Sequence, residues 1–164
     1  MLPLVTVGIP VKNGFAKRYI DENFIYAEDD IDLEKALNSI LKQSYKNIEI
    51  IISNNGSSDE TNMYLEKIAK SDNRIRVFNQ NPEILPLANF QFLLKNSIGK
   101  YFKWNAADDM ISEDFIEKNV EFLENNLDYS CSSSKFWFQN EKEKVRANKI
   151  ENNDLKKKYY IKDM

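Results

Sequence analysis

The chain has 164 residues, of which 42% are apolar, and its 23 basic and 26 acidic side chains leave a net charge of −3. This length fits one domain that buries roughly 68–70% of the surface its unfolded chain exposes. The charge balance argues against a dedicated nucleic-acid-binding protein, which carries a marked basic excess. The sequence has no histidine and one cysteine, Cys131, which excludes Ser-His-Asp catalysis, intrachain disulfides and zinc sites built on those residues. Any metal would therefore be held by oxygen ligands, as Mg²⁺, Mn²⁺ or Ca²⁺ is.

Predicted strands and helices alternate along the chain. In chain order they are a strand at Leu4–Ile9, a helix at Leu33–Gln43, a strand at Ile48–Ile52, a helix through Met63–Ile68, a strand at Arg74–Phe78, a helix at Leu87–Ser97, a strand at Tyr101–Trp104, a helix at Glu113–Asn126, and strands at Tyr129–Ser133 and Phe136–Phe138. Ser57 or Ser58 is the expected N-cap of the second helix, and Ser112 that of the fourth. Repeated βα units predict an α/β fold with a mostly parallel sheet and helices on both faces.

Three polar turns each follow a predicted strand directly: Pro10–Gly14, Ser53–Asp59 and Asn105–Asp109. In parallel α/β sheets, ligands gather at the carboxyl ends of the strands. We therefore expect these three turns to lie at one edge of the sheet.

The third turn carries two adjacent acids, Asp108 and Asp109. Two carboxylates in one turn repel each other, so a cation or a hydrogen-bond donor is expected nearby. A metal held by one or two carboxylates completes its shell with water and phosphate oxygens. The alternative for this pair alone is a helix-entry turn whose acids favour the helix dipole.

The second turn carries the adjacent amides Asn54 and Asn55. An asparagine amide offers both an acceptor and donors, so it can match a base edge with one N–H and one carbonyl, such as that of uracil. The alternative is an Asn-Gly turn, in which both residue types tolerate a positive φ angle. Asn13-Gly14 in the first turn has the same two interpretations.

An ordered set of segments resembles a known family. These segments are Leu4–Gly14, Ala36–Tyr45, Glu49–Thr61, Asp72–Ile75, Asn89, Gly99–Phe102 and Ala107–Asp109. Together they closely resemble the nucleotide-binding half of the family 2 glycosyltransferases, over residues 3–125. The resemblance implies a GT-A (Rossmann-like) fold and transfer of a sugar, with inversion, from a nucleotide diphosphate sugar to an acceptor hydroxyl. It also implies a role in bacterial surface polysaccharide synthesis and a divalent cation, Mn²⁺ or Mg²⁺, bridging the diphosphate.

The resemblance also assigns site residues. The implied nucleotide-sugar-binding residues are Pro10, Val11, Asn13, Asn54, Asn55, Asn89 and Asp108, and the implied metal ligands are Asp108 and Asp109. Two features depart from the family pattern. Asn54 and Asn55 stand where acids usually contact the base and ribose, which leaves the base open, and Ala106 stands where an acid is common.

No catalytic residue is identified. The general base of the family lies in the acceptor-binding half, which nothing after Asp128 resembles, so we expect a truncated form of the fold. Residues 1–140 are expected to form the donor-binding domain, with an insert at 15–32, and residues 141–164 a Lys-rich tail. The expected partners are the donor and a saccharide or lipid-linked acceptor. The alternative function is a non-catalytic nucleotide-binding or interaction module on the same α/β scaffold.

The sequence also bears on where the protein works. Met1–Val11 has the pattern of a strand rather than of a secretory leader, and no apolar run approaches the roughly 20 residues of a spanning helix. We therefore expect a cytoplasmic protein. The basic and aromatic run Lys156–Tyr160 is suited to contact with an anionic membrane surface at the inner face, and a solvated tail is the alternative.

Overall fold

The computed structural model describes residues 2–15, 33–134, 137–139 and 144–146. The chain divides into two units, Met1–Ser132 and Ser133–Met164. The predicted insert lies outside the described residues except for Phe15, as does most of the predicted tail. No helix in the described ranges is long and apolar enough to span a bilayer.

The first unit is built on a four-stranded, all-parallel sheet. Its elements are β1 (Val5–Val11), α1 (Leu33–Leu41), β2 (Ile48–Asn54), α2 (Thr61–Ser71), β3 (Ile75–Asn79), α3 (Pro86–Lys95), β4 (Tyr101–Trp104) and α4 (Phe115–Asn125). The strand order is β3-β2-β1-β4, and each neighbouring pair is parallel. The predicted α/β sheet is thus confirmed.

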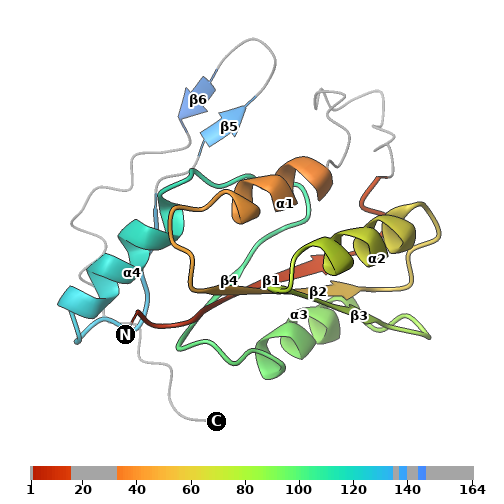
Figure 1. The fold of residues 1–164 in the computed structure, drawn as a ribbon, viewed down its shortest axis with the longest axis horizontal. Helices are drawn as coiled ribbons and strands as arrows, with labels where there is room; N and C mark the ends of the chain where they lie inside the picture. Colours follow the sequence, from red (N-terminus) through yellow and green to blue (C-terminus); the bar gives the residue numbers. More distant parts are fainter. Residues whose placement is uncertain (1, 16–32, 135–136, 140–143, 147–164) are drawn as a thin grey trace. The chain divides into compact units, whose positions relative to one another are not determined.

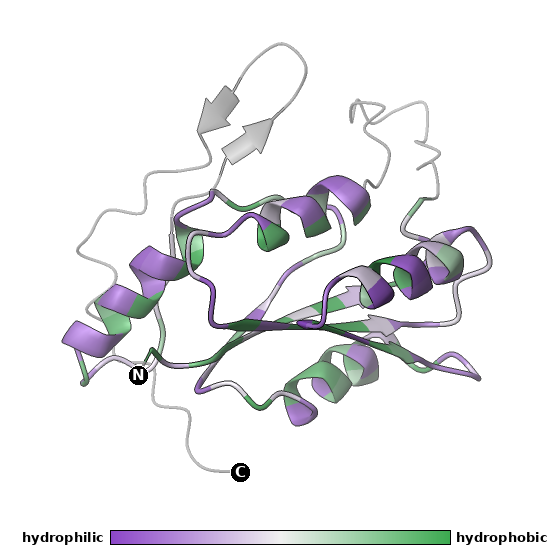
Figure 2. Cartoon of the chain, viewed as in Figure 1, coloured by the Kyte–Doolittle hydropathy of each residue, from purple (hydrophilic) through white to green (hydrophobic). Residues whose placement is uncertain are grey.

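Helices cover both faces of this sheet (Figure 1). The helices α1 and α2 lie on one face, and α3 lies on the other. Right-handed crossovers require this arrangement, because the chain steps one way from β1 to β3 and returns across the sheet to β4. All seven residues of β2 are buried, which agrees with the apolar run in the sequence. Figure 2 shows hydrophobic (green) stretches in the sheet, interrupted by white and purple ones.

The apolar stripe of α1 packs on the sheet as its spacing predicts. Leu33, Leu37 and Ile40 are fully buried and belong to the same core as the apolar residues of β1 and β2. In α3 only Asn89 and Leu93 are buried. Phe90 and Leu94, which share its apolar sequence pattern, stay 40% and 45% exposed.

The structure corrects the predicted helix caps. The α2 helix begins at Thr61, and the carboxylate of Asp59 accepts its backbone N–H at 3.1 Å, so neither Ser57 nor Ser58 is the N-cap. The α4 helix begins at Phe115, and the Ser112 hydroxyl donates to the Asp114 carboxylate. The backbone N–H of Ile116 is instead satisfied by a side chain from another helix end, that of Gln43.

The predicted strand at Tyr129–Ser133 is wrong, since these residues form no strand in the structure. In the second unit, β5 (Trp137–Gln139) overlaps the predicted strand Phe136–Phe138. It pairs antiparallel with β6 (Lys144–Arg146), a strand that the sequence pattern did not indicate.

Candidate functional site

The three polar turns lie at one edge of the first unit, as predicted from the topology. They follow β1, β2 and β4, whose carboxyl ends meet because the strands are parallel. Val11 of β1 pairs with Asn54 of β2. The chain leaves β4 beside β1, where the backbone N–H of Asn105 donates to the carbonyl of Gly8 at 2.9 Å.

The turn after β1 is fastened to the turn after β2 by consecutive backbone groups. The N–H of Asn13 donates to Ser57 Oγ at 2.8 Å, that of Gly14 to Thr61 Oγ1 at 2.8 Å, and that of Phe15 to Asp59 Oδ2 at 3.0 Å. Asn13 itself adopts a left-handed conformation, with φ at 53°. Its Oδ1 accepts the backbone N–H of Ser58 at 2.9 Å. This asparagine therefore joins the two turns in the structure.

Asp59 serves both turns as an ionised acceptor. Burial acts to raise the pKa of its carboxyl, but hydrogen bonds from Thr61 and from the backbone N–H of Phe15 outweigh this and lower the pKa. A carboxylate that accepts several N–H and O–H groups is stabilised in its charged form. Hydrogen bonds therefore join the first two turns, Pro10–Gly14 and Ser53–Asp59, into one rim, which we call the cross-linked rim.

The amides of Asn54 and Asn55 are engaged within the chain. Asn54 Nδ2 donates to Asn79 Oδ1 at 3.1 Å, and its Oδ1 accepts the backbone N–H of Ser57 at 3.3 Å. Asn55 binds both backbone groups of Ile84, donating to its carbonyl at 2.8 Å and accepting its N–H at 2.9 Å. Both side chains are 4% exposed and hold neighbouring loops.

A polar hollow of about 440 Å³ opens at the carboxyl ends of β2 and β3. We call it the amide pocket, because most of the side chains around it are amides. Its lining residues are Asn54, Gly56, Ser57, Asn62, Asn79, Gln80 and Asn81. The left-handed backbone at Gly56, with φ at +66°, is the conformation expected of an Asn-Gly turn. The pocket offers uncharged donors and acceptors to a ligand.

The acid turn, Asn105–Asp109, presents its two carboxylates to solvent, since Asp108 and Asp109 are exposed. Inside the turn, Asn105 is 1% exposed and donates from Nδ2 to the carbonyls of Ala106 and Asp109, at 2.9 and 2.8 Å. Lys103 Nζ donates to Asn105 Oδ1 at 2.9 Å. The exposed acids thus lie on a turn whose backbone is held by hydrogen bonds from the buried Asn105 side chain.

Lys103 brings a positive charge next to the acid turn. Its ammonium lies 5.2 Å from the centre of the Phe115 ring. Burial lowers the pKa of this ammonium, and the negative charge of Asp109 acts in the opposite direction. Sequence reasoning singled out neither Lys103 nor Asn105. The only signal available was their nearness in sequence to the acid pair, since Lys103 lies five residues and Asn105 three residues before Asp108.

The donor set fits a cation that keeps other ligands. Across the described parts of the chain, no group of three or more acidic or cysteine side chains is placed to hold a metal ion. Asp108 and Asp109, the predicted metal ligands, are both exposed and would supply one or two carboxylates to a cation. Mg²⁺ and Mn²⁺ sites of this kind take their remaining ligands from water and phosphate oxygens.

The predicted nucleotide-contacting residues differ in accessibility. Pro10 is half-buried, whereas the Val11 side chain is 3% exposed and belongs to the core. Asn89 is also 3% exposed, and its Nδ2 lies 3.3 Å from the carbonyl of Ser53. Asn89 Oδ1 is buried without a hydrogen-bond partner. Among these predicted residues, Asp108 is therefore the most accessible to a ligand.

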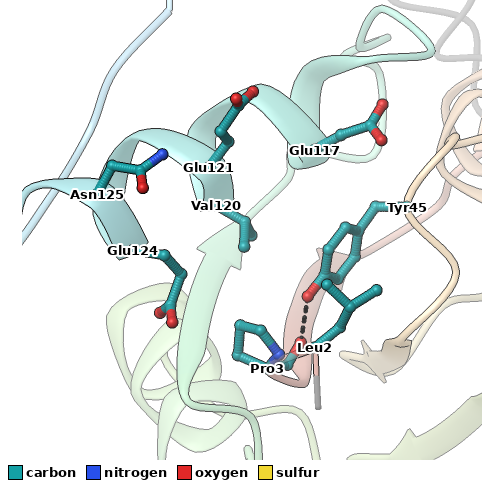
Figure 3. Close-up of a pocket in the computed structure, with 8 residues that line it drawn as sticks. All are labelled: Leu2, Pro3, Tyr45, Glu117, Val120, Glu121, Glu124 and Asn125. Carbon is teal, nitrogen blue, oxygen red and sulfur yellow. Dashed lines mark hydrogen bonds between the residues drawn. The ribbon is translucent and has the colours of Figure 1, made fainter.

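A second hollow, of about 590 Å³, lies near the amino ends of the strands. Figure 3 shows Glu117, Glu121 and Glu124 of α4 on one side of it and Tyr45 on the other. The Tyr45 hydroxyl donates to the carbonyl of Pro3 at 2.6 Å. Because Pro3 precedes β1, this hollow is remote from the three turns and does not belong to their edge.

Sequence comparison identifies the family. Residues 25–163 match the family described as Glycosyl transferase family 2. The chain belongs to this family. An uncharacterized glycosyltransferase of Haemophilus influenzae is 36% identical over 124 residues, which cover 76% of this chain and 34% of that protein. Glycosyltransferase GlyA of Streptococcus pneumoniae is 33% identical over 143 residues, which cover 82% of this family 2 chain and 18% of GlyA. The chain thus spans about a third or less of these two relatives.

Solved structures confirm the GT-A fold of the family 2 chain. S. aureus TarS, in a complex with UDP, matches with a TM-score of 0.60 at 19% identity, over 75% of this chain and 32% of that one. The mannosyltransferase PcManGT of Pyrobaculum calidifontis, in a complex with GDP-Man and Mn²⁺, gives a TM-score of 0.60 at 19% identity, over 75% and 33%. The matched region is one part of the fold.

Proposed function

We propose that this family 2 chain binds a nucleotide diphosphate sugar at the carboxyl edge of its sheet and supplies the donor half of a glycosyl transfer. The observation that carries the proposal is that the exposed acid turn and the cross-linked rim lie at one edge. Family membership adds the reaction class. The sugar would pass, with inversion, to a saccharide or lipid-linked acceptor, in bacterial surface polysaccharide synthesis at the cytoplasmic face of the membrane.

Strand order suggests how the donor lies. The acid turn follows β4, and the amide pocket opens at the ends of β2 and β3, with β1 between β4 and β2. Neighbouring strands are about 4.8 Å apart, so β4 and β2 are separated by about 10 Å. An extended nucleoside diphosphate spans a comparable distance. We place the diphosphate at the acid turn and the base toward the amide pocket, with Pro10 and Asn13 beneath the nucleoside.

A divalent cation, Mn²⁺ or Mg²⁺, would bridge the acid pair and the diphosphate. When bound, it supplies positive charge that offsets the charge developing on the leaving nucleoside diphosphate. Asp108 and Asp109 would hold it from the protein side. The Mn²⁺ and GDP-Man in the PcManGT complex support this proposal by analogy.

Calorimetric titration of the purified chain with UDP, GDP and dTDP, each with and without Mn²⁺ or Mg²⁺, tests the proposal. We expect binding of at least one nucleotide to depend on the cation. Asp109→Ala should weaken that binding about tenfold or more, because a ligand to the cation is removed. The matched control is Asp128→Ala, which removes an exposed carboxylate from another turn and should leave binding unchanged.

A non-catalytic module is the second candidate. It is favoured by the amides of Asn54 and Asn55, which are engaged within the chain, and by Ala106, which carries no acid. The titration separates donor binding from a module that binds no nucleotide, and detection of sugar transfer separates a transferase from a module that binds nucleotide without catalysis. If no nucleoside diphosphate binds with either cation, the donor-binding proposal fails and the interaction module is favoured.

Transfer with inversion also needs a carboxylate to accept the proton of the acceptor hydroxyl. We assign no residue of this chain to that role. The base is expected in an acceptor-binding part, and detection of sugar transfer would require that part to be present.

A further inference from the structure

A buried asparagine lies inside the acid turn. Asn105 is 1% exposed, and its Nδ2 donates to the carbonyls of Ala106 and Asp109 at 2.9 and 2.8 Å. The N–H of Asp109 donates back to the carbonyl of Ala106 at 3.2 Å. One side chain therefore ties together the two ends of the segment that carries both exposed carboxylates.

Lys103 fixes which way this amide faces. Its Nζ donates to Asn105 Oδ1 and to the carbonyl of Trp104, both at 2.9 Å. An ammonium group has donors and no acceptor, so it selects the oxygen end of the amide. If the amide were flipped, its NH₂ group would face the ammonium, and its oxygen would face two carbonyl oxygens. Lys103 thus directs both Asn105 donors into the turn.

The acid pair needs such support. Adjacent carboxylates repel each other, and the turn has Ala106 where another acid could share a cation. A site with only two protein carboxylates depends strongly on how its backbone presents them. Groups that orient metal ligands from behind are typically worth 10–100-fold in metal affinity.

We propose that Asn105 is a positioning residue, locked by Lys103, that holds the acid turn in the shape that binds a divalent cation together with a diphosphate. This inference rests on the proposed function, because the cation and diphosphate are the ligands assigned to this turn there. It goes further by naming the residues that set the affinity without touching the ligand.

Asn105→Leu tests the inference, since leucine has a similar size and makes no hydrogen bond. Mn²⁺ is titrated into the 164-residue chain at saturating UDP or GDP, followed by calorimetry and by the electron paramagnetic resonance spectrum of the ion. We expect the Kd for Mn²⁺ to rise about 10–100-fold. Asn105→Ser, whose side chain is too short to reach both carbonyls, is the milder second variant and should change the Kd in the same direction.

Thr6→Val is the matched control for lost stability. The Thr6 hydroxyl is fully buried near the amino end of β1, where it donates to Glu49 Oε1 at 2.5 Å and accepts the N–H of Gly99 at 2.9 Å. Its replacement should lower the melting temperature and leave the Kd for Mn²⁺ unchanged. An equal rise in the Kd for Thr6→Val would overturn the inference.

The remaining outcomes are distinct. If both Asn105 variants bind Mn²⁺ as the wild-type chain does, the positioning role is wrong and the proposed function stands. If the wild-type chain binds no Mn²⁺ with UDP, GDP or dTDP, this inference fails, and the proposed function fails with it if Mg²⁺ gives the same result.

Discussion

Gln43 holds the start of α4 from a distant part of the chain, and its removal should be costly. It lies just beyond α1 and is fully buried. Its Nε2 donates to the carbonyls of Ser39 and Ser112 at 3.1 and 2.7 Å, and its Oε1 accepts the N–H of Ile116 at 3.0 Å. That N–H belongs to the first turn of α4, where backbone donors have no partner within the helix.

The change Gln43→Leu keeps the volume and removes all three hydrogen bonds. The main cost is the buried N–H of Ile116, which is left unpaired, since Ser112 is exposed and water can reach its carbonyl. An unpaired buried group costs about 1–3 kcal/mol. We therefore expect the free energy of unfolding, measured in urea, to fall by about 1–3 kcal/mol, with an unchanged dependence on urea concentration.

Gln91→Leu is the control, because Gln91 is exposed on α3 and undergoes the same chemical change. It should alter the free energy of unfolding by no more than about 0.5 kcal/mol. If Gln43→Leu costs no more than this control, α4 does not depend on Gln43, and the reasoning from buried hydrogen bonds is refuted.

Two further stability predictions follow from single contacts. The side-chain hydrogen bond from Arg74 lowers the pKa of the Asp72 carboxyl in the folded state. The ionised carboxyl therefore stabilises the fold above its unfolded pKa of about 3.9, and this stabilisation is lost as the pH falls through the folded pKa. The melting temperature of Asp72→Asn should therefore lie below that of the wild type at pH 7 and approach it below about pH 4; a constant difference down to pH 2 would contradict this. Gly99→Ala should lower the free energy of unfolding by about 1–3 kcal/mol, because its Cβ would lie 2.6 Å from the backbone nitrogen of Thr6. An unchanged melting temperature would contradict this, because it would mean that the loop containing Gly99 can move away from the Thr6 backbone at little cost.

Local patterns were sufficient to predict the four parallel strands, the four helices and the edge where the turns lie. The apolar residues of β2 and α1 predicted which side chains are buried. A strand covered on both faces is apolar throughout, whereas a helix with one covered face has apolar residues every three or four positions. Strand–helix alternation then fixes parallel strands, and parallel strands bring the turns after β1, β2 and β4 to one edge. The pattern at Tyr129–Ser133 failed, since a short apolar or polar run carries no information about a pairing partner.

Only the tertiary structure decided which polar side chains are engaged and which are available. Asn13, Asn54 and Asn55 look like ligand contacts in the sequence, yet they join loops far apart in the chain. Gln43 replaces the expected Ser112 cap across more than seventy residues. The physical reason is that an amide or hydroxyl can form a hydrogen bond with any donor or acceptor that the fold places beside it. Spacing along the chain specifies a helical or extended pattern, whereas the partner of a buried polar group is set by which distant segments pack together.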